Sequence, residues 1–515
     1  MVTTRPPDRC GSDRSGTAGR SGTARLAVIR SALTAWLARP LTSLHLVVAV
    51  FGLLTLFGLV MVLSASAVQS FEQEGSSYAV FTRQLAFCGV GLVLFWIALR
   101  LPVRLLRGTS TAFLLACLVL LTLVLTPLGS ESNGAQSWFR LGSASFQPSE
   151  AAKLALALWG AHVLVTKRVL LHRWRHLLVP LVPVAVTVFA LVMLQPDLGT
   201  TIILAIVLLA LLWFAGAAAE LFGAILVAAV AGAIALAGVA GYRSDRIESF
   251  LDPGTDPQGA AFQARQALYS LADGGWWGVG LGRGSAKWDY LPNAHNDFIF
   301  AIIGEELGFV GCAVVIGLFA VFVYTGLRIA ARSIDPFWRL LSATATTWIV
   351  GQAMINIGYV IGLLPVTGLQ LPLVSAGGSS LAITLFMFGV IANAARHEPE
   401  AVAALNSGQD GKISKLLRLP KPVLYHPPSG GRPIRRPKPA RQIEPARGRD
   451  GRRAIETGDR RKRADQGARP SSDSNRGAAA GSRKRTAGGQ NGQRRQAPTR
   501  RAQDPREVRE RGIRR

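Results

Sequence analysis

Long apolar runs alternate with short polar segments between residues 45 and 395. A helix needs about 20 apolar residues to cross the hydrocarbon core of a bilayer. Ten runs approach or reach that length, and the pattern therefore predicts an all-α polytopic membrane protein with about ten transmembrane helices. The runs lie at roughly 45–66, 80–100, 111–128, 149–166, 177–194, 199–215, 221–241, 298–326, 338–361 and 378–395. Because only Gln195-Pro-Asp-Leu198 separates the fifth run from the sixth, these two are expected to form a tight helical hairpin.

Basic residues gather in the loops of one predicted side. The loops 101–110, 167–176 and 327–337 carry Arg or Lys and follow the second, fourth and eighth runs. By the positive-inside rule, these loops and both termini are cytoplasmic. The loop between the seventh and eighth runs, 242–297, is then extracellular and far longer than a plain connection. Its Trp276 and Trp277 are typical of the membrane interface and equally of a ligand contact.

Composition agrees with this organisation and adds a charged tail. Of the 515 residues, 50% are hydrophobic and only 17% are charged, whereas a soluble chain carries about 25% charged residues. A soluble globule, a collagen-like fibre and a disulfide scaffold are excluded, and the four cysteines show no metal-ligand spacing. We expect a disordered basic segment at 1–40, a membrane domain at 41–397 and a disordered polycationic cytoplasmic tail at 398–515.

The tail holds 31 Lys and Arg against 12 Asp and Glu. Such a segment, next to a membrane, is expected to lie on anionic lipid. Nucleic acid and a protein partner are alternative ligands, but nothing that resembles a folded nucleic-acid module accompanies the tail.

Polar residues at the ends of the runs are the candidates for chemistry, because charge within a membrane is costly. Glu150 and Lys153 are three residues apart on one helix face, so they could form an internal ion pair, or Lys153 could neutralise an anionic ligand together with Arg140. Asp197 is interpreted as the cap of the sixth helix. Asp297, where a polar loop enters the eighth run, is either an ordinary N-cap or a functional carboxylate.

Further polar groups lie in or beside the last three runs. Glu305 and Glu306 are deep enough that one should pair with a basic group inside the bundle. The glycine series 278–284 could form an anion nest, but it lacks the strand and helix of a dinucleotide fingerprint. Gln352 and Asn356 must face protein rather than lipid. Segment 365–380, with two prolines and three glycines, predicts irregular backbone that is buried or lines a cavity.

One set of these candidates comes out on the predicted external side: Arg140, Lys153, Asp197, Arg243, Arg246, Asp297 and segment 365–380. Cations, one well-placed carboxylate and an apolar bundle suit a lipid with an anionic head. The chain does not show polar groups at mid-bilayer in two repeated halves, as a secondary transporter would.

Five stretches carry a family resemblance across about residues 40–396. They are NGAQSWFRLG with FQPSEAAKLALA, QPDLGT, FQARQALYSLADGGWWGVGLG, LPNAHNDFIFAIIGEELGFVG and LPVTGLQLPLVSAGGSS. They resemble the SEDS family of bacterial cell-wall proteins, which has division, elongation and sporulation members. The high Arg content, the basic tail and the wording LQLPLVSAGGSS make the chain most similar to division members of actinobacteria.

The resemblance implies a peptidoglycan glycosyltransferase that polymerises lipid II at the outer leaflet and releases undecaprenyl diphosphate. It implies that Asp297 is catalytic, although this chain has Asn293-Ala-His-Asn-Asp where the family usually has Glu-Ala-His-Thr-Asp. Asp297 would act as general base on the attacking sugar hydroxyl, with inversion at the anomeric carbon. No resident metal site is predicted, but Mg or Mn could assist the leaving diphosphate. The expected substrate contacts are Arg140, Lys153, Arg243, Arg246, Gln263, His295 and Ser379.

The resemblance also implies partners and leaves alternatives open. It implies a class B penicillin-binding transpeptidase held by membrane helices, other division proteins, and the division ring as a ligand of the basic tail. The expected location is the septal cytoplasmic membrane. An elongation-type polymerase, a lipid II flippase and a non-enzymatic scaffold for the division machinery are the alternative functions.

Overall fold

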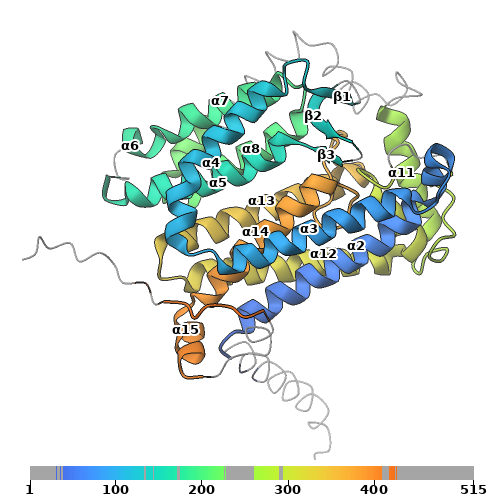
Figure 1. Cartoon of the computed structure of the whole chain (residues 1–515). Coiled ribbons are helices and arrows are strands. Elements are labelled where there is room, and N and C mark those ends of the chain that lie inside the picture. Colours follow the sequence, from blue (N-terminus) through green and yellow to red (C-terminus); the bar gives the residue numbers. More distant parts are fainter. Residues whose placement is uncertain are drawn as a thin grey trace, which may run out of the picture. The chain divides into compact units, whose positions relative to one another are not determined.

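The computed structural model describes the main part of the membrane domain and short parts of its flanks. The described residues are 39–132, 135–142, 144–170, 174–225, 260–288, 294–408 and 417–423, with single positions 31, 35, 227 and 425. They form a bundle of helices with a small sheet at one end, as Figure 1 shows. We call this end, which carries the strands and α11, the strand end, and the end that carries α15 the tail end.

The long helices follow the predicted apolar runs, and nine of the ten runs coincide with described helices. Most of the seventh run, 221–241, lies outside the described residues. The helices are α2 (Thr42–Glu74), α3 (Ala79–Arg100), α4 (Val103–Leu123), α5 (Pro148–Thr166), α6 (Trp174–Leu178), α7 (Leu181–Met193), α8 (Leu198–Phe214), α11 (Ala260–Gly274), α12 (Ile299–Arg332), α13 (Pro336–Val360), α14 (Gly378–Arg396) and α15 (Pro399–Asn406), with one 3₁₀ turn at Arg168–Leu170.

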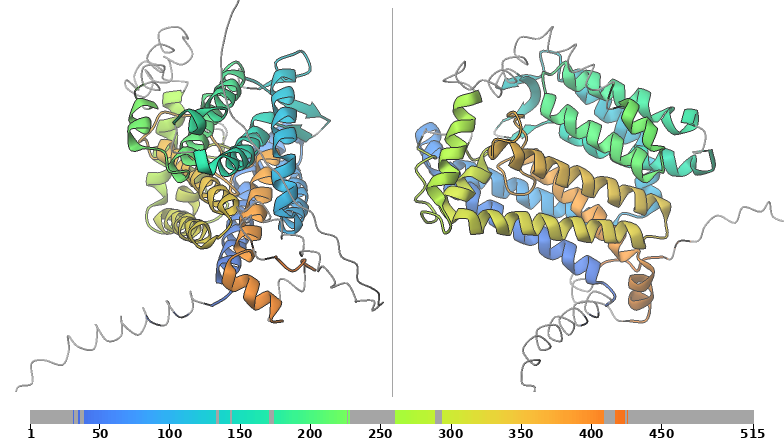
Figure 2. Two further views of the ribbon diagram at one scale, coloured as in Figure 1. Left: turned by 90° about the vertical axis from the view of Figure 1, so that its left-hand side faces the viewer. Right: turned by 180° about the vertical axis from the view of Figure 1, so that it is seen from behind.

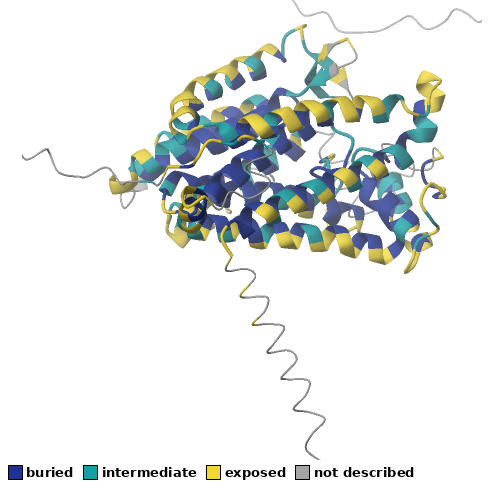
Figure 3. Ribbon diagram, turned by 60° about the horizontal axis from the view of Figure 1, so that its bottom comes forward, coloured by how far each residue is buried: buried dark blue, intermediate teal, exposed yellow. Residues whose placement is uncertain are grey.

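The length and apolar composition of the described helices identify the candidate membrane spans. Six described helical segments are long and apolar enough to span a bilayer by length and composition, and α8 is a shorter apolar helix. Helices α5 and α13 carry more polar residues, which fits their almost complete burial among the other helices. Figure 3 shows the same division along single helices, with buried inner faces and exposed outer faces. The protein is therefore a polytopic helical membrane protein, as predicted.

Neighbouring helices place α5 and α13 next to the candidate site. Helix α13 packs against α12 on one side and α8 on another, and the view from behind in Figure 2 shows this order. Helix α14 packs along α3, and α5 packs between α4, α8 and α13. The polar faces of α5 and α13 consequently meet inside the bundle.

A three-stranded antiparallel sheet lies between α4 and α5 and was not predicted. Its strands are β1 (Ser130–Ser132), β2 (Ala135–Leu141) and β3 (Ala144–Phe146) in the order β1-β2-β3. Phe139 pairs with Phe146 and Arg140 with Ser145. The strands are short and polar, so they give only a weak periodic signal beside the apolar runs.

Helix α12 is interrupted by a break at Gly308, whose backbone has φ 67° and ψ −166°. In a regular helix, Phe309 N–H and Val310 N–H would donate to the carbonyls of Glu305 and Glu306. Here they donate instead to Gly275 O (2.9 Å) and Trp276 O (3.3 Å) of the preceding loop. In return, Val279 N–H (2.9 Å) and Gly280 N–H (3.0 Å) of that loop donate to those two glutamate carbonyls. The loop at 275–280 is thus hydrogen-bonded into the break.

The chain between α13 and α14 is irregular, and its second half is buried, as predicted. Leu369, Leu371, Leu373 and Val374 are almost fully buried. Residues 361–377, which we call the inserted segment, contain neither helix nor strand. Irregular backbone inside a membrane protein needs hydrogen-bond partners from protein, and the candidate site supplies them.

The predicted boundary at residue 398 differs from the structure. Helix α15 lies beyond it, and Arg332 at the end of α12 forms ion pairs with Glu398 (3.7 Å) and Glu400. Farther on, Arg396 donates to Pro420 O (2.5 Å), and Arg100 donates to Leu417 O (3.2 Å). The folded part therefore extends past the expected start of the tail, because these carbonyls satisfy arginines at the tail end.

Candidate functional site

Asp297 lies at the strand end, immediately before α12. The N-cap of α12 is the next residue, Phe298, so the interpretation of Asp297 as an ordinary N-cap is wrong. Its carboxylate lies beside the inserted segment, since a Cβ added to Gly368 would be 3.7 Å from Asp297 Oδ2. Its backbone carbonyl accepts hydrogen bonds from Asn356 Nδ2 and Tyr359 OH, each at 2.8 Å. The main chain of Asp297 is therefore held by two side chains of α13.

Side-chain amides hold the inserted segment from the neighbouring helices. Gln352 Nε2 of α13 donates to Gln370 O at 2.9 Å. Gln84 of α3 donates to Ser375 O (3.1 Å) and accepts from Gly377 N–H (3.2 Å). These amides replace the missing secondary-structure partners. The predicted orientation of Gln352 and Asn356 toward protein is confirmed.

The inserted segment also contacts the chain that leads to Asp297. Ala376 N–H donates to His295 O at 3.0 Å. The residues just before α12 thus contact the inserted segment at two points: His295 binds Ala376 near its end, and Asp297 lies beside Gly368 in its middle.

Lys153 is the centre of a buried network on α5. Its ammonium group donates to Glu150 Oε1 (2.8 Å) and to Gln352 Oε1 (3.0 Å), and it lies 5.5 Å from the ring centre of Trp348. The Lys153 side chain is 0% exposed. Ser380 of α14 donates to the other oxygen of Glu150 at 3.1 Å. The structure thus forms the internal ion pair that the sequence allowed, and it joins α5, α13 and α14.

Asp197 caps α8, as predicted. Its carboxylate accepts from Thr200 N–H (2.9 Å) and from the Thr200 hydroxyl (2.6 Å). Gln147, the N-cap residue of α5, donates its side-chain amide to Asp197 Oδ2 at 3.1 Å. Gln147 N–H donates to the Ser379 hydroxyl at 3.2 Å. Ser379, a predicted substrate contact, therefore joins the first turns of α5 and α14.

Glu305 and Glu306, on α12, bind the loop that precedes it. Glu306 pairs with Lys287 at 3.1 Å and accepts from the Ser64 hydroxyl of α2 at 2.7 Å, so the predicted partner of one glutamate is found. The carboxylate of Glu305 accepts from Ser285 N–H (2.5 Å) and Ala286 N–H (3.2 Å). Backbone amides directly after the glycine series thus bind an anionic group, and this group is the Glu305 carboxylate of the protein itself.

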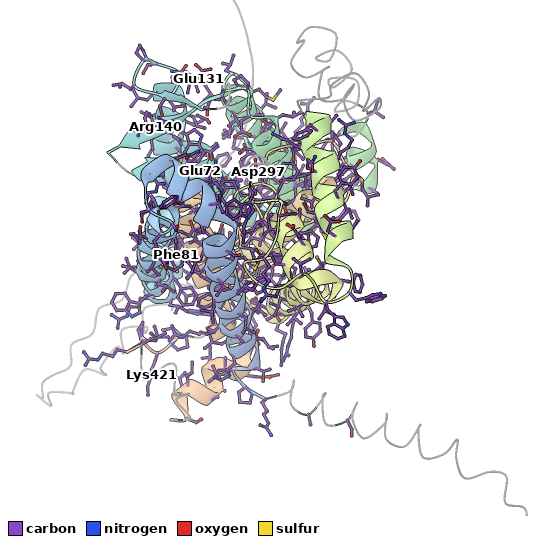
Figure 4. All side chains as sticks on the ribbon, turned by 90° about the vertical axis from the view of Figure 1, so that its right-hand side faces the viewer. Glu72, Phe81, Glu131, Arg140, Asp297 and Lys421 are labelled. Carbon is purple, nitrogen blue, oxygen red and sulfur yellow. The ribbon has the colours of Figure 1, made fainter. Side chains whose placement is uncertain are left out.

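The other predicted substrate contacts are spread over the strand end. Figure 4 looks onto this end, with Arg140 on the sheet and Asp297 toward the middle. Arg140 is exposed on β2. Gln263 is half-buried in the first turn of α11, which packs against α12 and α13. Arg243 and Arg246 lie outside the described residues.

The contributors to this region that were not predicted include Tyr359, Gln84, Gln147 and Arg83. Tyr359 reads as one aromatic residue in an apolar run, and Gln147 as part of a turn. Arg83 lies in the first turns of α3 and forms an exposed ion pair with Glu74 at 2.5 Å. The position of Arg83 close to His295 becomes visible only in three dimensions. Within the described part of the chain, no cluster of three or more His, Cys, Asp or Glu side chains could hold a metal ion.

Burial, and to a lesser degree the positive charge of Arg83, lowers the pKa of His295 to about 4 from an ordinary value of 6.5. The unfolded chain then binds more protons here between these two values, so this contribution to stability is complete above pH 6.5 and is lost as the pH falls toward 4.

We expect acidification from about pH 7.5 to about pH 5 to destabilise the protein through His295 by at most about 2 kcal/mol. His295→Gln should show a smaller fall in apparent Tm over this range than the wild type, measured in detergent. Equal falls in both proteins would contradict a role of His295 in the acid sensitivity.

Comparisons with known proteins place the chain among membrane proteins of one family. Residues 44–400 match the FtsW, RodA and SpoVE family, described as "Cell cycle protein". A relative from Mycobacterium tuberculosis, named probable peptidoglycan glycosyltransferase FtsW, is 55% identical over 423 residues, which cover 81% of this chain and 80% of the relative. Stage V sporulation protein E of Bacillus subtilis is 38% identical over 69% of this chain and 98% of its own length.

Solved structures agree. A chain from work on "structural coordination of polymerization and crosslinking by a peptidoglycan synthase complex" matches with a TM-score of 0.58 and 30% identity, over 71% of this chain and 99% of that one. The rod shape determining protein RodA of Thermus thermophilus matches with a TM-score of 0.51 and 28% identity over the same shares. On this sequence and structural agreement, the protein belongs to the FtsW, RodA and SpoVE family of multi-pass membrane proteins.

Proposed function

We propose that the protein is a peptidoglycan glycosyltransferase that polymerises lipid II into glycan strands during septal wall synthesis. The observation that carries the proposal is the Asp297 carboxylate, which lies beside Gly368 while its own carbonyl is bound by α13. The names of the relatives support the reaction, and the 55% identity to a mycobacterial FtsW supports division over elongation.

The strand end is assigned to the outside of the cytoplasmic membrane. Arginines gather at the tail end, where Arg100 and Arg396 bind the chain after α15 and Arg332 pairs with Glu398. By the positive-inside rule, the tail end is cytoplasmic. Asp297 then faces the leaflet in which externalised lipid II is available.

The reaction needs a base for the attacking sugar hydroxyl and positive charge for the leaving diphosphate. Asp297 takes the proton of the hydroxyl as that oxygen attacks the anomeric carbon of the second lipid II. Direct attack without an enzyme nucleophile inverts the anomeric centre. Asp297 is partly exposed at the strand end, so a lipid-linked substrate can reach it while the lipid tail stays in the membrane.

The fully paired Lys153 organises the site rather than meeting the diphosphate directly. Breaking its ion pair with Glu150 would leave a buried carboxylate without its positive counter-charge, which is costly. The exposed Arg140 and the predicted Arg243 and Arg246 are the proposed diphosphate contacts. A divalent cation, held by the diphosphate and a carboxylate such as Asp297, would screen the leaving charge.

We further propose a class B penicillin-binding transpeptidase as the membrane partner, because one structural match comes from a peptidoglycan synthase complex. Other division proteins, and the division ring as a ligand of the basic tail, are proposed as regulators.

The test is polymerisation of labelled lipid II by the purified protein together with its transpeptidase partner. We expect glycan strands in which the anomeric configuration is inverted at each new linkage. We expect fewer strands when a chelator removes divalent cations. Movement of lipid II across vesicle membranes without polymer would instead favour a flippase. If the intact complex recruits division proteins but shows neither activity, the scaffold function is favoured.

A further inference from the structure

Two side chains of α13 contact both Asp297, just before α12, and the inserted segment. Asn356 and Tyr359 are three residues apart, which places them on one helix face, and both are fully buried. Asn356 Nδ2 lies 2.8 Å from Asp297 O and 2.6 Å from Leu369 O. Tyr359 OH lies 2.8 Å and 2.7 Å from the same two carbonyls. We call this pair the carbonyl clamp.

The carbonyl clamp has fewer donor hydrogens than acceptor lone pairs, so every donor hydrogen has an acceptor. The Asn356 amide carries two hydrogens and the Tyr359 phenol carries one, so three hydrogens are shared between two carbonyls with two lone pairs each. The amide and the phenol are also 2.6 Å apart, which couples their positions. The Tyr359 ring is packed edge-on by Phe298, with ring centres 5.6 Å apart. Both donors are therefore held in place before they meet the carbonyls.

The two clamped carbonyls belong to the two segments of chain that meet at the Asp297 carboxylate. One is the carbonyl of Asp297 itself. The other is that of Leu369, directly after Gly368, which is the residue that the carboxylate faces. Fixing both carbonyls on one rigid helix fixes the distance between the carboxylate and the segment opposite it.

We propose that Asn356 and Tyr359 are positioning residues, which hold the general base in reach of the attacking hydroxyl. This inference rests on the proposed glycosyltransferase function. Neither side chain needs to touch the substrate, so their effect passes through the main chain of Asp297. Displacement of a catalytic group by about 1 Å costs up to about 100-fold in rate.

The variants Asn356→Leu and Tyr359→Phe test the carbonyl clamp. Asn356→Leu removes both amide hydrogens with little change in volume, and Tyr359→Phe removes only the phenol hydroxyl. We expect kcat for lipid II polymerisation to fall about 10- to 100-fold in Asn356→Leu and about 3- to 10-fold in Tyr359→Phe. KM should stay within about twofold of the wild type, because substrate contacts are retained.

Asn393 of α14 supplies a matched control. This asparagine is also buried, and its amide also donates to two carbonyls, Ala98 O (2.9 Å) and Leu101 O (2.8 Å). It contacts the last residues of α3 at the tail end rather than the site. Asn393→Leu therefore removes the same kind of amide donor as Asn356→Leu does. We expect a lower apparent Tm and a wild-type kcat per folded molecule.

The outcomes separate this inference from the proposed function. Wild-type kcat in both clamp variants, or an equal fall of kcat in Asn393→Leu, would overturn the positioning role. If Asn356→Leu does not fold, the milder Tyr359→Phe decides. If the wild-type complex polymerises lipid II and Asp297→Asn does not, the proposed function stands whatever the clamp variants show. If Asp297→Asn is fully active, the proposed role of Asp297 itself fails.

Discussion

Asp297→Asn is expected to abolish glycan polymerisation while leaving the protein folded. The substitution keeps the size of the side chain and removes the basic oxygen, and a positioned general base contributes about 100- to 10,000-fold to a rate. The clamp contacts of residue 297 use its backbone carbonyl, so they are unaffected by the change. The measurement is the rate of strand formation from labelled lipid II by the purified complex.

Glu72→Gln is the matched control for that variant. Glu72 is an exposed carboxylate at the end of α2, on the same face of Figure 4 as Asp297. The control removes one negative charge from the strand end without touching the inserted segment, and its rate should stay within about twofold of the wild type. A fully active Asp297→Asn protein would assign the base to another group.

Gly308→Ala is expected to prevent correct folding of the strand end. With φ 67° and ψ −166°, residue 308 occupies a region that is essentially restricted to glycine and costs other residues about 1–3 kcal/mol. An added Cβ would also lie 2.4 Å from Gly278 N and 2.6 Å from the carbonyl of Trp276. Backbone atoms cannot move aside as a flexible side chain can, so the loop would leave the break in α12. We expect a large loss of monodisperse protein and of polymerisation.

Gly317→Ala, on the same helix, isolates the effect of the break. The position is exposed, and an added Cβ would meet no atom within 4 Å. Alanine is the better helix former by about 1 kcal/mol, so this variant should be as stable as the wild type or slightly more stable. Yield, apparent Tm and activity are compared in parallel. A Gly308→Ala protein that matches Gly317→Ala in all three would contradict the role of the break.

The apolar pattern predicted most of the helices, because a membrane span must be long and apolar whatever its neighbours are. It could not predict the β1–β3 sheet, whose strands gain their stability from pairing with each other rather than from a periodic pattern. Nor could it predict the break at Gly308, since a glycine in an apolar helix has no local mark of its backbone angles. The hydrogen bonds that require this break come from residues about 30 positions earlier in the chain.

The candidate site was predicted only in part, because a sequence pattern reveals charged residues but not their distant partners. A charge such as Asp297, Glu306 or Lys153 is conspicuous in an apolar run, so each was found. Its partner was found only where the two are close in sequence, as with Glu150 and Lys153. Tyr359 and Gln84 were missed because each binds backbone carbonyls or amides, and no residue type identifies the backbone groups that it will meet.

The break in α12 has a consequence for how the chain enters the membrane during synthesis. Uninterrupted, the 34 residues of α12 would be about 51 Å long, well beyond the roughly 30 Å of hydrocarbon. The part after Gly308, about 24 residues, is sufficient to cross by itself and carries no carboxylate. Glu305 and Glu306 precede it, and Lys287 and Ser285 precede them. The partners of both acids therefore leave the ribosome first, and neither acid has to be stored alone in the hydrocarbon while the helix is being inserted.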